Sequence, residues 1–103
     1  MNFTVRERYQ LLNILPTQGD FRTIKTITGL RDDLLLSEQE VVDFNVVVDG
    51  ERITWDVNSE KPKEVTIGPV ATSVIVDALK ALDTEKKLTV DYVPLYEKFI
   101  NED

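Results

Sequence analysis

Apolar positions in the N-terminal part of the chain recur every three or four residues, which is the period of an amphipathic helix. Thr4 and Glu7 have the spacing of a capping box, in which each side chain accepts a hydrogen bond from the other residue's backbone N–H. We therefore expect a first helix to begin at Thr4 and to end before Pro16, which cannot continue it. Its apolar stripe consists of Val5, Tyr9, Leu11, Leu12 and Leu15.

Two further helices are predicted before residue 45. Asp20 is a suitable N-cap for the second helix, although the β-branched residues within 21–28 would also suit a strand. We favour a helix, because the apolar residues of this segment recur at helical spacing and neither alternating set of positions is cleanly apolar. Ser37 and Glu40 form a second capping box, which predicts a short third helix that ends near Phe44.

The period then changes to that of β-structure. Two β-rich runs, 45–48 and 51–55, flank Asp49 and Gly50. An Asp-Gly pair between such runs predicts a hairpin with a type I′ turn, which needs a positive φ at both central residues. After a polar loop, residues 64–67 are a plausible third short strand.

Helical spacing returns in the last third of the chain. Pro69 suits the first position of a helix that follows Gly68, and Asp91 can cap a last helix with Pro94 in its first turn. The order predicts an α+β fold with three N-terminal helices, a β-hairpin with a possible third short strand, and two C-terminal helices. A length of 103 residues indicates one globular domain over 1–103. We expect one core built from Leu12, Ile24, Leu30, Leu34, Ile53, Trp55, Ile75, Leu79, Leu82 and Phe99.

The chain contains neither histidine nor cysteine, which excludes most common catalytic and metal-binding chemistry. Its four glycines form no phosphate-binding loop, so we predict no cofactor and no metal. Catalysis by paired carboxylates would need a cleft, and the acids lie near predicted helix ends, so we expect no enzymatic activity. No apolar run reaches the roughly 20 residues of a membrane span, and the first residues do not look like a signal peptide, which favours the cytoplasm.

Charge is divided along the sequence. Residues 1–31 carry five bases and two acids, a net charge of +3, whereas residues 32–60 carry nine acids and one base, a net charge of −8. Either the two parts pack together and partly neutralise each other, or they form opposite electrical faces. The acidic part supplies the first candidate partner-binding patch: Glu38, Glu40, Asp43, Asp49 and Glu51. The basic part supplies the second: Arg6, Arg8, Arg22, Lys25 and Arg31.

The order of three helices and a hairpin is also that of a winged-helix DNA-binding protein. However, the predicted third helix and the hairpin tip carry acids where phosphate contacts would need lysine or arginine. We therefore do not expect nucleic acid to be a partner. In a second alternative, the same acids imitate the spacing of phosphates, and the protein inhibits a host nucleic-acid-binding complex by occupying its basic groove.

Several stretches resemble a group of small, functionally uncharacterised proteins encoded by tailed bacteriophages and prophages. They are Val5-Arg6-Glu7-Arg8, Leu15-Pro16, Gly19-Asp20-Phe21, Leu30-Arg31, Ser37-Glu38-Gln39-Glu40, Leu79-Lys80-Ala81-Leu82-Asp83, Lys87-Leu88-Thr89 and Leu95-Tyr96-Glu97-Lys98-Phe99. The resemblance implies a bacterial cytoplasm or a virion, and it carries no active site. We expect a non-enzymatic accessory protein that binds a protein with a basic surface, and the sequence leaves the partner's identity and the oligomeric state open.

Overall fold

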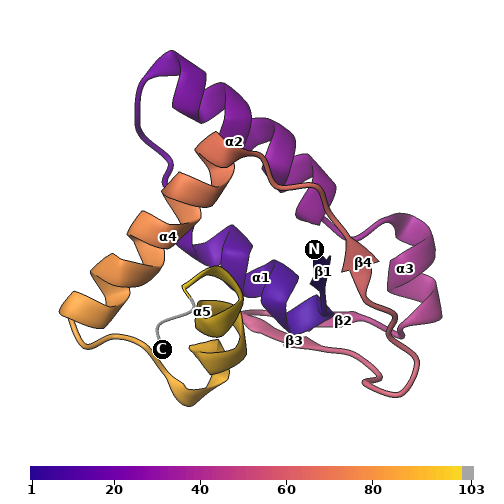
Figure 1. Ribbon diagram of the computed structural model, residues 1–103. Helices are drawn as coiled ribbons and strands as arrows, with labels where there is room; N and C mark the ends of the chain where they lie inside the picture. Colours follow the sequence, from indigo (N-terminus) through magenta and orange to yellow (C-terminus); the bar gives the residue numbers. More distant parts are fainter. Residues whose placement is uncertain (101–103) are drawn as a thin grey trace.

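The computed structural model describes residues 1–100 and combines helices with two small antiparallel sheets (Figure 1). This mixture agrees with the predicted α+β class. In chain order the elements are β1 (Asn2–Phe3), α1 (Val5–Ile14), α2 (Phe21–Leu34), α3 (Glu38–Asp43), β2 (Val47–Asp49), β3 (Arg52–Thr54), β4 (Lys63–Glu64), α4 (Pro69–Thr84), the 3₁₀ turn η1 (Val90–Tyr92) and α5 (Val93–Phe99).

The predicted starts of the first three helices are confirmed. At α1 the Thr4 hydroxyl accepts from the Glu7 N–H, and Glu7 accepts from the Thr4 N–H. Ser37 and Glu40 repeat this arrangement at α3. Asp20 caps α2 by accepting a backbone N–H at 2.8 Å, so the ambiguous segment is helical. Each cap satisfies backbone donors that the first turn of a helix leaves without partners.

The core lies where α1, α2, α4 and α5 pack together (Figure 1). Four residues of the predicted core are buried in it, namely Leu30, Leu34, Ile75 and Leu79, and three more pack at its margin, namely Leu12, Ile24 and Phe99. The prediction is wrong for Ile53, Trp55 and Leu82, which are half-buried outside this cluster. Phe3, Leu11, Leu15, Ile27, Val65, Ala71, Leu95 and Ile100 complete the buried set.

The possible third strand does not extend the hairpin. Strand β4 is formed by Lys63–Glu64 and pairs antiparallel with β1 at the N-terminus, with Phe3 opposite Lys63. Phe3 is fully buried and its ring stacks on Phe99 with the ring centroids 6.0 Å apart. Burial of this ring therefore fixes β1, a two-residue strand too short to show a period in the sequence.

The hairpin β2–β3 forms as predicted, but its turn is shifted by one residue. Asp49 pairs with Arg52, so Gly50 and Glu51 are the central residues, and only Gly50 has a positive φ, of 63°. This is the pattern of a type II′ turn, not the type I′ turn expected from Asp-Gly. The observed register places opposite charges across from each other and apolar Val48 opposite Ile53, and both pairings stabilise a ladder.

At the C-terminal end, α4 begins at Pro69 after Gly68 as predicted. The last helix, α5, begins at Val93, so Asp91 does not cap it. Asp91 instead lies in η1, where its carboxylate pairs with Arg6 at 3.5 Å and so joins the C-terminal segment to α1.

Candidate partner-binding surfaces

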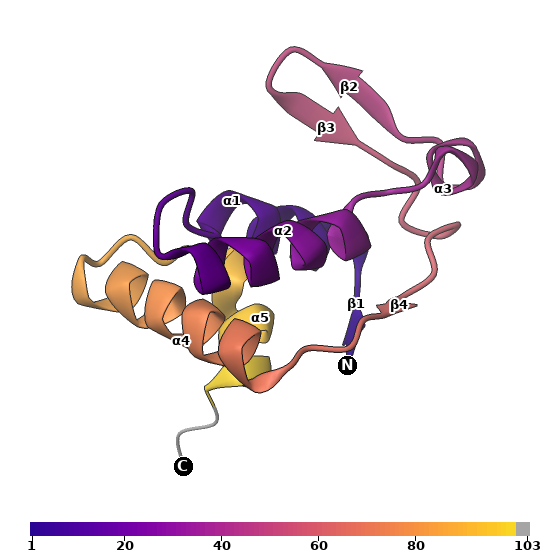
Figure 2. The same ribbon diagram turned by 90° about the horizontal axis from the view of Figure 1, so that it is seen from above.

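Helix α3 and the hairpin form one projecting unit, residues 38–54, which we call the arm. Figure 2 shows it extending above α1 and away from α4. Two backbone hydrogen bonds tie the hairpin to the end of α3, from the Val46 N–H to the Val41 oxygen at 3.0 Å and from the Asp56 N–H to the Phe44 oxygen at 2.8 Å. The arm is therefore a continuous extension of the chain that is anchored at its base.

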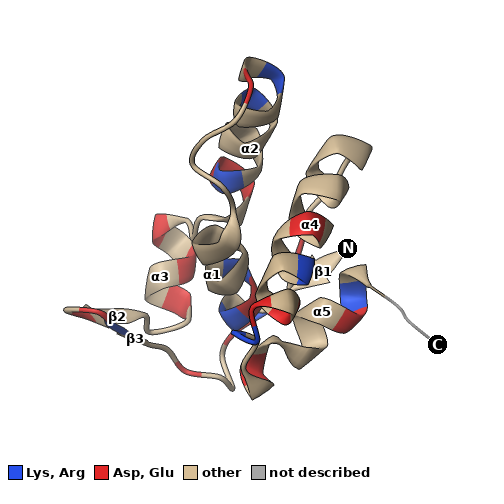
Figure 3. Ribbon diagram, turned by 90° about the vertical axis from the view of Figure 1, so that its left-hand side faces the viewer, with Lys and Arg blue, Asp and Glu red and all other residues tan. Residues whose placement is uncertain are grey.

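The arm carries both acids and exposed apolar side chains. Its five carboxylates are opposed by Arg52 alone, a net charge of −4, and Figure 3 shows the acids along α3 and on the hairpin. Val42, Val47 and Val48 are between 56% and 70% exposed. Single exposed valines are ordinary on a protein surface, but three on one small projecting unit indicate a surface that suits a partner.

The predicted acidic patch lies on the arm with one exception. Glu38, Asp43, Asp49 and Glu51 are exposed and have no ion-pair partner among residues 1–100. Glu40 is different, because its side chain is only 21% exposed and pairs with Arg8. Glu40 therefore holds the arm in place, and its charge is not available to a partner.

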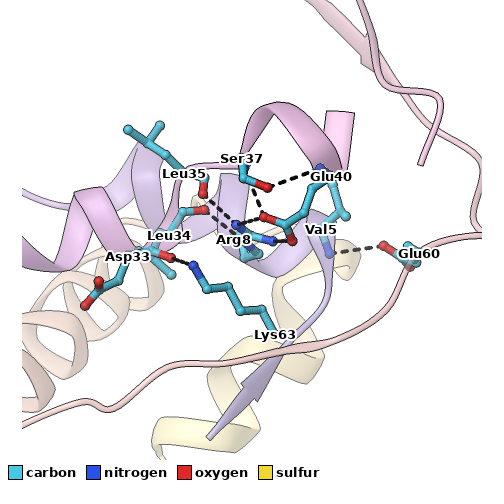
Figure 4. Close-up of polar contacts among 9 residues, drawn as sticks. All are labelled: Val5, Arg8, Asp33, Leu34, Leu35, Ser37, Glu40, Glu60 and Lys63. Carbon is cyan, nitrogen blue, oxygen red and sulfur yellow. Dashed lines mark hydrogen bonds and ion pairs between the residues drawn. The ribbon is translucent and has the colours of Figure 1, made fainter. Parts of the chain in front are cut away.

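Arg8 connects three helices (Figure 4). Its side chain is 1% exposed, and its Nη1 donates to Glu40 Oε2 at 2.7 Å while Nη2 donates to Glu40 Oε1 at 3.2 Å. Nε donates to the Leu34 oxygen at 2.8 Å, and Nη2 also donates to the Leu35 oxygen at 2.7 Å. The guanidinium of α1 therefore caps the C-terminal end of α2 and neutralises an acid of α3.

This pairing shifts the pKa of Glu40. The pKa of the Glu40 carboxyl is lowered from 4.5 to about 2, mainly by hydrogen bonds from the Arg8 guanidinium and also by the hydrogen bond from the backbone N–H of Ser37. Partial burial opposes this change, but a carboxylate with such donors is favoured in its charged form. Glu40 is consequently ionised throughout the ordinary pH range.

The five residues of the predicted basic patch do not form one surface. Arg8 is buried, and Arg6 lies beside η1 in its ion pair with Asp91. Arg22, Lys25 and Arg31 are exposed on α2, but Arg22 and Arg31 are nine residues apart. That separation is about two and a half helical turns, which places them on opposite sides of α2.

A groove lies between residues 51–60, which run from the hairpin tip into the loop after β3, and residues of α1, η1 and α5. It consists of two cavities of about 540 and 280 Å³ that share Arg6, Trp55 and Asp91 in their linings. Trp55 follows β3 and contacts Tyr9 of α1, with ring centroids 6.2 Å apart. Partial burial raises the pKa of the Tyr9 hydroxyl, and the charge of Arg8 opposes this shift. The sequence predicts Trp55 in the core, whereas the structure places it in the lining of the groove.

Three side chains along this groove have polar atoms without a hydrogen-bond partner. In the described part of the chain, Glu7 Oε2, Gln10 Oε1 and Trp55 Nε1 are the buried side-chain oxygens and nitrogens that lack one. Glu7 and Trp55 line the larger cavity, and Gln10 and Trp55 line the smaller one. Such atoms are uncommon because each costs desolvation free energy, so their gathering along one groove marks it as a candidate binding site.

The described residues show neither a metal cluster nor a spanning helix. Over residues 1–100, no three acidic side chains come together as metal ligands would. No helix in the same range has the length and apolar character needed to cross a membrane. Comparisons with known protein families, curated proteins and solved structures found no match.

Proposed function

We propose that the protein is a non-enzymatic accessory protein that acts by binding another protein through the arm. The observation that carries this proposal is the combination of exposed valines with unpaired acids on a unit that projects from the helices. The valines supply apolar area for a contact, and the acids favour a partner with a basic surface.

The hairpin also offers backbone hydrogen bonds. Within residues 1–100, β2 and β3 pair only with each other, so one edge of each strand has unpaired backbone groups. A two-stranded hairpin is marginally stable by itself, and a partner strand that adds to an edge would stabilise it. We therefore favour a partner that contacts the hairpin along an edge and the acids through lysine or arginine.

Nucleic acid suits this surface poorly. Glu38 and Asp43 on α3 and Asp49 near the hairpin tip would repel phosphates. If the resemblance to tailed-phage proteins reflects the origin of the chain, the partner is a bacterial host factor or another phage protein. A nucleic-acid-binding host complex would be the partner if the arm acts as a phosphate mimic.

Site-specific photo-crosslinking tests the proposal. A photoreactive amino acid in place of Val47, which is 56% exposed on the hairpin, should capture a defined partner in bacterial cells. The same substitution at Lys80, which is exposed on α4, serves as the matched control. Binding through the arm would be contradicted if the variant at Lys80 captured the same partner with the same yield, or if the variant at Val47 captured none.

Charge reversal then tests the acids with the captured partner. Glu38→Lys with Asp43→Lys should reduce the association rate constant several-fold at low salt, and less at high salt because ions screen steering over about 8–10 Å. Asp77→Lys with Glu97→Lys makes the same change in net charge on α4 and α5 and should have little effect. Glu40 is left unchanged because its reversal would place a cation against Arg8. An association rate that is equal in both double variants would exclude steering by the arm.

A further inference from the structure

The side of the hairpin that faces α1 carries an apolar pair, Val48 and Ile53. Alternate residues of a strand point to the same side, and Val48 lies opposite Ile53 in the ladder. Ile53 and Trp55 line the smaller cavity of the groove, so this side faces the helices. Val48 is still 66% exposed, which shows that the apolar side of the hairpin is only partly covered.

The larger cavity of the groove also has apolar lining. The larger cavity is lined by Val57, Val90 and Pro94 in addition to Trp55. Val57 is 66% exposed and Val90 is 85% exposed. Apolar side chains that border a cavity while facing water lose little by accepting an occupant and gain burial of their surface.

The partnerless polar atoms add a pattern of donors and acceptors. Trp55 Nε1 is a donor, whereas Glu7 Oε2 and Gln10 Oε1 are acceptors. The remaining polar atoms of Glu7 and Gln10 have partners inside the protein. Glu7 Oε1 accepts from Lys98 Nζ at 2.8 Å, and Gln10 Nε2 donates to the backbone oxygen of Asp91 at 2.9 Å. All three atoms are buried, so an occupant meets the side chains that carry them and reaches the atoms only after these side chains reorient. Two adjoining cavities that share lining residues suit an elongated occupant such as an extended polypeptide.

The net charge of the residues that line the groove favours a positively charged occupant. The charged residues that line the two cavities are Arg6, Lys98, Glu7, Glu51, Glu60 and Asp91. Two bases against four acids give the groove a net charge of −2. Asp91 and Glu7 are already paired, with Arg6 and Lys98 respectively, which leaves Glu51 and Glu60 without a cation among the residues that the structure places.

We propose that this groove binds an extended segment of a partner protein that carries an arginine, whose guanidinium stacks on Trp55 and pairs with Glu60. Arginine fits better than lysine because its planar guanidinium is attracted to an aromatic face and forms forked hydrogen bonds to carboxylates. Glu60 Oε2 accepts the Val5 N–H at 3.1 Å, which fixes the carboxylate at the cavity (Figure 4). The groove is a second surface, and of the acids on the arm it includes Glu51 alone.

Trp55 provides a direct reporter. It is the only tryptophan of the chain, so a ¹H–¹⁵N spectrum of the full chain contains a single indole cross-peak, from the partnerless Nε1. The probes are three capped pentapeptides in which valine alternates with arginine, lysine or glutamate. The arginine peptide should shift the indole cross-peak until the site is saturated, and it should bind with the highest affinity of the three. The lysine peptide should bind more weakly, and the glutamate peptide should not bind. No saturable movement, or equal affinity for the glutamate peptide, overturns the proposal.

Three variants identify the residues involved. Glu60→Gln keeps an acceptor for Val5 but removes the charge, and it should weaken the arginine peptide about three- to tenfold, as expected for a charge-assisted hydrogen bond. Glu64→Gln makes the same change on β4, outside the groove, and should bind like the unmodified protein. Val90→Ser removes apolar lining at a side chain that is too exposed to affect folding, and it should also weaken binding of the arginine peptide.

Unchanged affinity for the arginine peptide in both Glu60→Gln and Val90→Ser overturns the assignment. None of these residues belongs to the outer surface tested by Val47, Glu38 and Asp43, so the two proposals fail separately.

Discussion

Replacing Arg8 by methionine should destabilise the whole domain. Methionine retains most of the apolar stem but removes a guanidinium that is 1% exposed. The variant loses two hydrogen bonds to Glu40 and two to the last carbonyls of α2, at Leu34 and Leu35. These two carbonyls would then lose the guanidinium donor, and the Glu40 carboxylate would keep only the backbone N–H of Ser37.

The expected magnitude follows from burial. Removal of one partner from a buried ion pair costs about 3–5 kcal/mol, because the other charge remains without compensation. Glu40 is 21% exposed, so water can solvate part of its carboxylate. We therefore expect Arg8→Met to lower the free energy of unfolding by about 2–4 kcal/mol at neutral pH.

Acid should reduce this difference. The pKa of Glu40 is lowered from 4.5 to about 2, so the stabilisation is fully present above 4.5 and is lost as the pH falls through about 2. Without Arg8 the pKa of Glu40 should return towards 4.5, and the variant loses this dependence. We expect the difference in unfolding free energy between the two proteins to shrink by about 1–2 kcal/mol between about pH 6 and about pH 3, after allowance for solvent screening.

Urea denaturation followed by Trp55 fluorescence and by circular dichroism measures both quantities. Arg6→Met is the matched control, because Arg6 is 59% exposed and its 3.5 Å pair with Asp91 lies at the surface. Such pairs contribute about 0–1 kcal/mol, so the control should be nearly neutral. A loss below about 1 kcal/mol for Arg8→Met, or one equally large at both pH values, would refute the proposed role of the Arg8–Glu40 pair.

Two further outcomes test the core and the exclusion of DNA. Leu79 is fully buried between the helices, so Leu79→Ala should cost about 2–5 kcal/mol of unfolding free energy by urea denaturation, whereas a loss below about 0.5 kcal/mol would mean that α4 is packed differently. Mixed duplex DNA should show no mobility shift with the protein at low salt. A tight complex that weakens steeply with salt would instead indicate phosphate contacts and favour the winged-helix alternative.

Local signals in the sequence predicted the helices well. The capping residues Thr4, Asp20 and Ser37 act within three positions of their partners, so their spacing alone identifies them. The hairpin was found for the same reason. The turn was predicted one residue too early, because the Asp-Gly signal is local and does not show which residues pair across the strands. The Asp49–Arg52 and Val48–Ile53 pairs determine the register.

Features that depend on distant residues were not predictable. Arg8 and Glu40 are 32 positions apart, and in the sequence each resembles an ordinary charged residue of a helix surface. Trp55 was expected in the core because tryptophan usually is buried, yet the hairpin carries it to the groove beside α1. The division of charge along the sequence was visible, but only the fold shows that one pair from the two parts is neutralised internally while Glu38, Asp43, Asp49 and Glu51 remain exposed.

The position of the arm depends on two adjacent residues of α1. Arg8 binds Glu40 at the α3 end of the arm, and Tyr9 contacts Trp55 where the hairpin returns towards the body. Because consecutive residues of a helix point about 100° apart, one helix can hold both ends of the arm without any contact at its tip. The hairpin tip is therefore left free for a partner, while the width of the groove is set at its base. Because the proposed interaction surface and the proposed groove site share this anchored hairpin, we expect occupation of the groove also to stabilise the orientation in which Val42 and Val47 are presented.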